Sequence, residues 1–252
     1  MKNKNYHKYK IQEYDTIDYA SLWSGRKRKY LDAIERDIIN RLVQPSSNKR
    51  LIDLGCGFGR LSETYLYKYK KVILFDYSKK NLLQAAEKIS NNEKVSFIQG
   101  DVYNLPFKDN SFDTVFMIRL FHHLEDPTRV ISEVRRILRG EGNFLFTFYN
   151  KYDLRTRCKS FLRLSSPGIS RVQHENVSKD GLLYVSDPDY VKQFLSQHGF
   201  VIKGRYGIGF LKCGFLKYSR IPGLIEKYLY KFSGRFNLTT EIFIHATLKK
   251  NS

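Results

Sequence analysis

The sequence has few of the residues that mark specialised architectures. Its 252 residues include 3 cysteines, 6 prolines and 16 glycines. The cysteines (Cys56, Cys158 and Cys213) are far apart and odd in number, which argues against a disulfide framework or a zinc module and favours a reducing compartment. Proline and glycine are too scarce for a fibrous or low-complexity protein.

Long hydrophobic runs are also missing. No stretch reaches the roughly 18 apolar residues that span a bilayer, and the basic segment 1–10 lacks the apolar region of a secretory signal. We therefore expect a soluble, cytoplasmic protein without a transmembrane segment. Hydrophobic residues still make up 42% of the chain and aromatic residues 15%, which is enough for one sizeable core.

Acidic residues are outnumbered, with 25 Asp and Glu against 44 Lys and Arg and a formal net charge of +19. Most of this excess lies outside the middle hundred residues, and it is largest in the last hundred. A basic surface attracts RNA, anionic lipid or an acidic substrate. Because the basic residues are scattered, with no compact run longer than 26–29, we interpret them mainly as a solvated surface.

Strand and helix signals alternate between residues 48 and 150. The expected strands are 49–54, 71–75, 95–98, 112–118 and 143–148, and the expected helices are 60–69, 79–89 and 127–138. Ser78 is expected to cap the second helix. This rhythm predicts an α/β fold, a parallel sheet with helices on both faces.

The two ends are expected to wrap this core. We predict a helix within 16–43, an irregular insertion over 151–185, a helix over 187–198, and closing strands over 200–210 and 241–248. The expected division of the single domain (1–252) is a helical cap (1–47), a cofactor-binding core (48–150), an acceptor-covering region with closing elements (151–235) and a last strand (236–252).

The strongest functional signal is the segment DLGCGFG at 53–59, which follows the first expected strand. Its spacing is GxGxG, not the dinucleotide GxGxxG, and no lysine completes a P-loop. Asp76 ends the second strand and Asp101 follows the third, at the edge where such sheets bind ligands. Acids at the ends of three successive strands beside a glycine turn indicate a nucleoside site without a phosphate.

The motifs of this region together resemble the class I S-adenosylmethionine-dependent methyltransferases, and most closely the subgroup with quinone and small-molecule enzymes. They are LIDLGCGFGR at 51–60, FDYS at 75–78, QGDVYNLPF at 99–107, SFDTVFMIRLFHHLEDP at 111–127 and RRILRGEGNFLF at 135–146. The resemblance covers about 48–150 well and the closing strands loosely. It implies a doubly wound, mostly parallel, seven-stranded Rossmann-like sheet with an antiparallel closing strand, and S-adenosylmethionine (SAM) as the cofactor.

The resemblance also implies roles for individual residues. The methionine part of SAM would meet Gly55, Gly57 and Gly59, with its amino group held by Asp53. The nucleoside would be bound by Asp76 at the ribose, Tyr77 beside the adenosine, Asp101 at the adenine amino group and Val102 against the ring. Ile118 and Arg119 would lie near the sulfonium. Cys56 is expected to pack beside the cofactor. No metal site is expected.

His122 and His123 follow the fourth strand and are the candidates for a general base, since a neutral imidazole suits a phenol, hydroxyl or amine acceptor. We prefer His122 because it is nearer the strand end. The alternative is that both only shape the pocket. Aromatic residues expected at the acceptor pocket are Tyr14, Tyr19, Trp23, Tyr152, Phe161, His174 and Tyr184.

Three functions remain open. The first is methyl transfer to O or N of a small metabolite or natural product, including a lipid-like quinone met at an anionic membrane. The second is a tRNA or other RNA methyltransferase, and the third a non-catalytic SAM-binding regulatory protein. The sequence IRLF at 118–121 lacks the Pro-Pro-aromatic turn of enzymes that act on an exocyclic base nitrogen, and no cysteine there serves cytosine-C5 chemistry.

Overall fold

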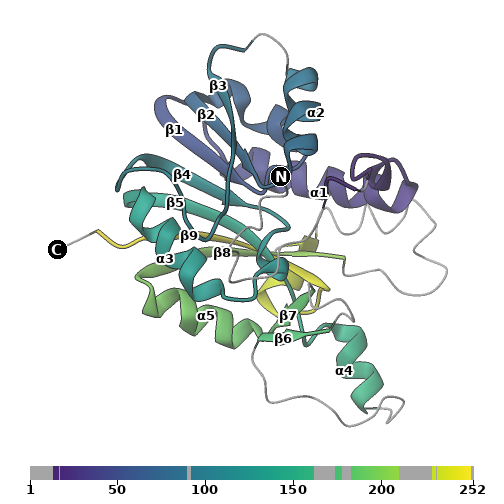
Figure 1. Cartoon of the computed structure of the whole chain (residues 1–252). Coiled ribbons are helices and arrows are strands. Elements are labelled where there is room, and N and C mark those ends of the chain that lie inside the picture. Colours follow the sequence, from purple (N-terminus) through teal and green to yellow (C-terminus); the bar gives the residue numbers. More distant parts are fainter. Residues whose placement is uncertain are drawn as a thin grey trace, which may run out of the picture.

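The computed structural model describes residues 14–16, 18–89, 92–161, 174–177, 183–209, 229–230 and 232–250. Seven of the strands form one sheet in the order β3-β2-β1-β4-β5-β9-β8 (Figure 1). They are β1 (Ser46–Leu54), β2 (Tyr69–Asp76), β3 (Val95–Gln99), β4 (Phe112–Met117), β5 (Leu138–Tyr149), β8 (Phe200–Ile208) and β9 (Glu241–Leu248). Strands β1 to β5 are parallel, and β9 is antiparallel to both β5 and β8, which confirms the expected fold.

Helices cover both faces of this sheet (Figure 1). One face packs on α3 (Pro127–Ile137) and α5 (Pro188–Gln197), in a core rich in phenylalanine from β4 and β5. The other face packs on α1 (Arg26–Leu42) and α2 (Lys79–Ile89). The Ser78 hydroxyl accepts a hydrogen bond from the Asn81 backbone N–H at 3.1 Å, so the expected cap of α2 is present.

The expected helix over 60–69 is wrong. Two short 3₁₀ turns, Ser62–Thr64 and Leu66–Lys68, stand there, and β2 already begins at Tyr69. The turns bring Tyr65 into the core, where its ring is fully buried and its hydroxyl donates to the Asp53 carboxylate. The sequence pattern does not show this contact, which favours the two short turns over a regular helix.

The region after β5 contains helices and strands that are too short to give a recognisable hydrophobic pattern in the sequence. Helix α4 (Leu154–Phe161) is followed by a hairpin of β6 (His174–Asn176) and β7 (Tyr184–Ser186). This hairpin lies beside the 3₁₀ turn Phe121–His123 that follows β4. The predicted insertion is therefore partly structured, and residues 162–173, 178–182 and 210–228 of the expected acceptor-covering segment lie outside the described residues.

The order of the strands sets the place of a ligand crevice. The chain runs outward from β1 through β2 to β3, and then returns to the other side of β1 with β4. Open α/β sheets bind ligands at this reversal, outside the carboxyl ends of the strands. Gly55, Asp76 and Ile118, which follow or end these strands, meet at that edge. Within the described residues no helix is long and apolar enough to cross a membrane.

Candidate active site

The glycine turn after β1 has a backbone that side chains disfavour. Gly55, Gly57 and Gly59 have φ of 69°, 55° and 69°, in the left-handed region. The Gly55 and Cys56 N–H groups donate to the Phe75 carbonyl at 2.8 and 3.2 Å, which ties the turn to β2. The turn is thereby held open toward the carboxyl edge of the sheet.

A pocket at this edge brings together most of the predicted cofactor residues. Its predicted lining residues are Gly55, Gly57, Asp76, Tyr77, Asp101, Val102, Ile118 and Arg119. It is also lined by four residues that the sequence analysis did not single out for it, which are Asn81, Tyr103, Leu120 and Leu124. The last three lie within motifs that carried the resemblance, so their position in the motifs was the available signal.

Gly59 is the predicted residue that faces elsewhere. A Cβ added to it would lie 3.2 Å from the Ala85 Cβ and 3.3 Å from the Ile89 Cδ1, both on α2. Gly59 lines neither this pocket nor the one beside it. Its lack of a side chain therefore serves the close packing of α2 against the turn, not contact with a ligand.

Asp76 is oriented by hydrogen bonds to both of its carboxylate oxygens. Oδ2 accepts from the Gly57 N–H at 2.7 Å, and Oδ1 accepts from the Ser78 N–H at 2.9 Å. Burial raises the pKa of this carboxyl above its ordinary value, although these bonds oppose the shift. Each carboxylate oxygen accepts more than one hydrogen bond, so Asp76 retains acceptor capacity toward the pocket.

Asp101 and Tyr103 shape the other end of the pocket. The Asp101 carboxylate accepts from the Tyr103 N–H at 2.9 Å. The Tyr103 hydroxyl accepts from the Glu125 N–H at 3.0 Å, which joins the loop after β3 to the loop after β4. Val102 packs against the aromatic core on this side. This end of the pocket therefore combines an apolar wall with one carboxylate.

A smaller polar pocket adjoins the first and shares Tyr19, Gly55, Ile118 and Arg119 with it. Its own lining includes Asp53, Cys56 and Arg60. Burial raises the pKa of Asp53 to about 7, even though the Tyr65 hydroxyl donates to it. Burial also raises the pKa of the Cys56 thiol, which accords with a packing role.

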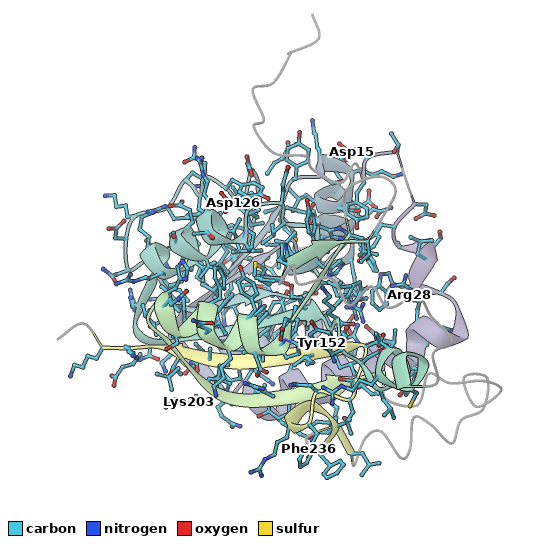
Figure 2. The ribbon with its side chains drawn as sticks, turned by 90° about the horizontal axis from the view of Figure 1, so that it is seen from below. Asp15, Arg28, Asp126, Tyr152, Lys203 and Phe236 are labelled. Atoms are coloured by element: carbon cyan, nitrogen blue, oxygen red, sulfur yellow. The ribbon has the colours of Figure 1, made fainter. Side chains whose placement is uncertain are left out.

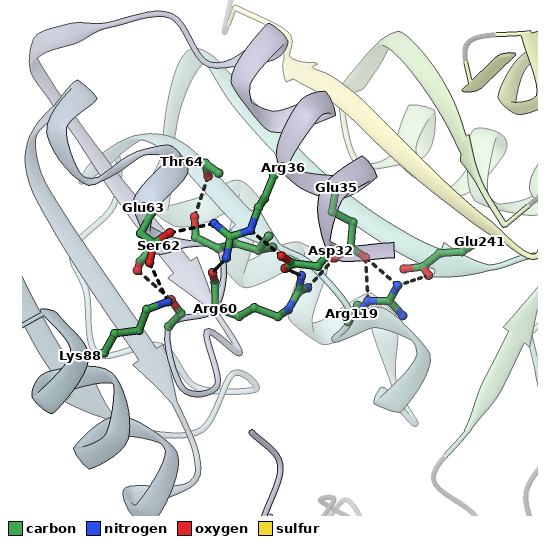
Figure 3. A network of polar contacts seen from close by, with 12 residues as sticks. Asp32, Glu35, Arg36, Arg60, Ser62, Glu63, Thr64, Lys88, Arg119 and Glu241 are labelled. Carbon is green, nitrogen blue, oxygen red and sulfur yellow. Dashed lines mark hydrogen bonds and ion pairs between the residues drawn. The ribbon is translucent and has the colours of Figure 1, made fainter. Parts of the chain in front are cut away.

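Two arginines at this pocket belong to a buried ion network (Figure 3). Glu35 of α1 is fully buried and lies 2.5 Å from Arg60 and 2.6 Å from Arg119. Arg119 also pairs with Glu241 at 2.8 Å, and Arg60 pairs with Asp32. Burial alone would raise the pKa of Glu35, but the two guanidinium groups outweigh it and hold that pKa below its ordinary value.

The ion network holds the side chain of Arg119, a residue that the sequence analysis expected near the sulfonium. Its backbone borders the pocket with φ of 60°, and its N–H donates to the Thr147 hydroxyl at 2.9 Å. Its side chain is directed to Glu35 and Glu241 and lies 5.1 Å from the Trp23 ring centre. This arrangement could not be predicted from the sequence, because Glu35 and Arg119 are 84 residues apart.

The two histidines occupy different environments. His123 lines the main pocket, and its Nε2 lies 3.0 Å from the Tyr14 hydroxyl. His122 is buried outside the pocket lining, and its ring stacks on Tyr149 with 4.2 Å between centres and 19° between planes. Burial holds the pKa of His122 well below its ordinary value. The geometry therefore favours His123 over the preferred His122, because the 3₁₀ turn after β4 directs His122 inward.

The segment before α1 closes the main pocket on its outer side. Asp15 accepts from the Ser78 hydroxyl at 2.5 Å and from the Lys80 N–H at 3.1 Å. Tyr14 and Tyr19 line the pocket, with 4.8 Å between their ring centres. The Tyr19 ring lies over the glycine turn, since its Cε1 would be 3.3 Å from a Cβ at Gly57.

The other aromatic residues expected at the acceptor pocket lie farther away. Trp23 is buried against Arg60, whose guanidinium carbon lies 3.6 Å from the ring centre. His174 and Tyr184 stack on each other in the β6–β7 hairpin, and the His174 Nε2 lies 2.9 Å from the Leu124 carbonyl oxygen. Tyr152 is half-buried and is not among the residues lining the pocket, and the side chain of Phe161 lies outside the described residues.

Comparison with known proteins finds a family and several relatives with similar sequences. Residues 52–146 match the family described as "Methyltransferase domain". The chain is 25% identical over 158 residues to the demethylmenaquinone methyltransferase of Clavibacter sepedonicus, covering 58% of this chain and 64% of that protein. It is 29% identical over 154 residues to the malonyl-[acyl-carrier protein] O-methyltransferase of Halalkalibacterium halodurans, covering 53% and 55%. The chain thus spans less than two thirds of the length of these curated relatives.

Among solved structures, a Listeria monocytogenes protein assigned as an S-adenosylmethionine-dependent methyltransferase superposes with a TM-score of 0.65. The two are 19% identical, and the match covers 88% of this chain and all of the other. Residues 52–146 are therefore identified as a methyltransferase domain. The chain has the fold of a protein assigned to the S-adenosylmethionine-dependent methyltransferases, which agrees with the class and the cofactor that the sequence motifs implied.

The site's donor set fits that cofactor. Asp76 and Asp101 offer carboxylates for ribose hydroxyls and an adenine amino group, and the glycine turn leaves room for a close ligand. The smaller pocket places the Asp53 carboxylate beside the glycine turn, which suits the positively charged amino group of that cofactor. Among the described residues no group of His, Cys, Asp and Glu is arranged to hold a metal ion.

Proposed function

We propose that the protein transfers a methyl group from SAM to an oxygen or nitrogen of a small metabolite or natural product. SAM supplies a methyl group that is already activated on its sulfonium. The chain's task is then to align the acceptor with the methyl group and to exclude water. The separation of the two pockets supports a division between a polar amino-acid end and a larger end for the nucleoside and acceptor.

In this proposal the two pockets divide the cofactor between them. Asp76 accepts from the ribose hydroxyls and Asp101 from the adenine amino group, with Tyr77 and Val102 beside the rings. In the smaller pocket, ionised Asp53 accepts from the amino group. Arg60 and Arg119 also line this pocket, where their guanidinium groups are held by the ion pairs with Glu35. The sulfonium then lies near Gly55 and Ile118, which line both pockets.

The contact between Tyr14 and His123 carries the assignment of the acceptor. A phenol hydroxyl lies 3.0 Å from Nε2 of His123 in a pocket whose nearby walls are Leu120 and Leu124. The pocket therefore holds a hydroxyl-bearing ring against an imidazole. An acceptor O–H or N–H that takes the place of Tyr14 would give its proton to His123 as the methyl group arrives.

The two alternative functions are RNA methylation and regulatory SAM binding. An RNA acceptor is favoured by the net charge of +19, and would show a binding affinity that falls steeply with salt. A regulatory SAM-binding protein is compatible with the fold, because the fold is not restricted to methyltransferases: a [4+2]-cyclase, SpnF, superposes with a TM-score of 0.59 at 17% identity. The apolar, hydroxyl-holding pocket favours a small acceptor over both.

The test is methyl transfer from labelled SAM to a panel of phenols, hydroxylated acids, small amines and transfer RNA. We expect label in one small-molecule class, with formation of S-adenosylhomocysteine. The variant His123→Gln should lower kcat by about 10²- to 10⁴-fold while leaving affinity for S-adenosylhomocysteine unchanged, because only proton removal is lost. The matched control is His245→Gln, since His245 lies on β9 and bonds to Asn143.

Label in transfer RNA alone would replace this proposal with the RNA alternative. Tight cofactor binding without transfer to any acceptor would favour the regulatory alternative. If His123→Gln retains full kcat on the acceptor found, His123 shapes the pocket and is not the base.

A further inference from the structure

A second surface of the molecule combines exposed aromatic rings with cations that form no ion pair within the described residues. Phe232 and Phe236 are 55% and 51% exposed, and their ring centres are 4.8 Å apart. Between them in the chain stands Arg235, which is exposed and lines an open groove with Lys203 and Arg205 of β8. Figure 2 shows Lys203 and Phe236 on the same side of the molecule, away from Asp15 and Asp126.

The turn that carries the two phenylalanines is firmly built. The Phe236 N–H donates to the Phe232 carbonyl at 3.2 Å, and the Leu238 N–H donates to the Ser233 carbonyl at 2.9 Å. Gly234 packs directly on β8, because a Cβ there would lie 2.5 Å from the Gly207 nitrogen. The exposed rings are therefore held outward by a fixed backbone.

The groove carries positive charge with little compensation. Its lining residues are Ile202, Lys203, Gly204, Arg205, Tyr206 and Arg235, none of which is acidic. Within the described part of the chain, no ion pair is formed by Lys203, Arg205 or Arg235. Asp189 is the acid whose charge reaches Arg205, and burial lowers the pKa of that arginine.

The aromatic turn of this surface is joined to the carboxyl end of β5. The Asn150 side-chain amide, just after β5, donates to the Asn237 and Thr239 carbonyls, each at 2.9 Å. Tyr149, the last residue of β5, stacks on His122 beside the pocket. The aromatic turn is thus tied to the strand end that borders the pocket.

The sequence that adjoins this surface also combines aromatic and basic residues. Residues 210–236 contain seven aromatic residues, six Lys and Arg and a single acid, Glu226. Aromatic side chains interleaved with cations suit the boundary between lipid headgroups and acyl chains, where rings insert and cations meet phosphates.

We propose that Phe232, Phe236, Lys203, Arg205 and Arg235 form a docking surface for an anionic lipid bilayer. The exposed rings enter the interface and the groove cations bind headgroup phosphates. RNA would also use the cations and would stack bases on the two rings, so RNA binding is a separate outcome of the test. The proposal does not depend on the acceptor assigned above.

The test is co-sedimentation of the full chain with two kinds of vesicle. One is phosphatidylcholine alone, and the other is phosphatidylcholine mixed with phosphatidylglycerol. We expect binding to the mixed vesicles that weakens with salt. The double variant Phe232→Ala/Phe236→Ala and the variant Arg235→Glu should each lower the partition coefficient by about tenfold or more.

Matched controls carry the same changes on a distant surface. Leu83→Ala removes another side chain that is 56% exposed, on α2, and Lys70→Glu reverses an exposed charge on β2. Both should bind vesicles like the unaltered chain. Binding of S-adenosylhomocysteine by every variant shows that it is folded and separates this test from that of the acceptor.

Three results would overturn the proposal. The first is equal binding to both kinds of vesicle, or none to either. The second is RNA binding that Arg235→Glu or the phenylalanine variant abolishes, which would make this surface a site for RNA. The third is a dimer in the absence of vesicles that the phenylalanine variant converts to monomer, which would make the surface a contact between copies of this chain.

Discussion

Asp53 is the residue at which burial and ligand binding oppose each other most directly. Its carboxyl is 4% exposed, and burial raises its pKa to about 7, so it is largely protonated in the free protein below that pH. The proposed partner is the positively charged amino group of SAM, which favours the ionised form. Ligand binding is therefore expected to release a proton below pH 7.

The first prediction follows from this shift. Affinity for S-adenosylhomocysteine should rise between about pH 5.5 and pH 7.5 and then level off, because Asp53 must ionise to accept from the amino group. Calorimetry across this range should show that Asp53→Asn binds more weakly and without this rise. A rise of the same size in Asp53→Asn would assign the proton to another group.

The stability of the free protein should change in the opposite direction. A carboxyl whose pKa is higher in the folded state than in the unfolded chain stabilises the fold at low pH, and this contribution is lost as pH rises toward about 7. Urea unfolding between pH 4 and 7.5 should show this loss, and Asp53→Asn should reduce it. An unchanged pH dependence in the variant would mean that Asp53 is ionised throughout.

At the scale of elements, α1 is fastened to the sheet by charge as well as by its apolar face. Leu31, Ile34 and Ile38 are buried against the sheet, and Glu35 on the same helix pairs with Arg60 and Arg119. These arginines follow β1 and β4, so one helix side chain fixes two loops of the active site (Figure 3).

A further prediction concerns the charge of the Glu35 side chain. Glu35→Gln should lower the free energy of unfolding by about 3 kcal/mol, because two buried guanidinium groups each lose an ionic partner. The control is Asp37→Asn, whose pair with the 54% exposed Arg41 should be worth less than about 1 kcal/mol. Trp23 is the single tryptophan and packs on Arg60, so its fluorescence reports the change. A loss for Glu35→Gln as small as the one expected for Asp37→Asn would show that the network does not stabilise the fold.

How far the sequence predicts the elements depends on the range of the interactions that form them. The helix over 79–89 has its predicted bounds, because Ser78 and an apolar stripe are local signals. The helix expected over 60–69 fails because Tyr65 is drawn to Asp53, a contact that periodicity does not show. The β6–β7 hairpin has strands of three residues, too short for a pattern.

The same distinction applies to the site. Asp76 and Asp101 were predictable because each stands at a strand end, and topology brings strand ends together. The choice between His122 and His123 was not predictable from the sequence. The two residues are adjacent in a 3₁₀ turn, and the rotation of that turn decides which ring faces the pocket. The ion network was also beyond sequence analysis, because its partners come from α1, two loops and β9.

At the scale of the whole molecule, the fold separates a cofactor edge from the segments that cover it. Tyr14, Asp15 and Tyr19 close the pocket from the N-terminal side, and the segment after the aromatic turn is joined through Asn150 to the carboxyl end of β5. This arrangement leaves the acceptor to reach His123 between covering segments, which is how closing segments exclude water from such reactions.

The most direct test of the account is calorimetric titration of the chain with S-adenosylhomocysteine. We predict one site per chain, and for Asp76→Asn an affinity that is lower by about 1.5–3 kcal/mol for each ribose hydrogen bond lost. Glu87→Gln, an exposed change on α2, should bind normally. If millimolar ligand gave neither heat nor a thermal shift with the unaltered chain, or if Asp76→Asn bound as tightly as the unaltered chain, the assignment of this site would be contradicted.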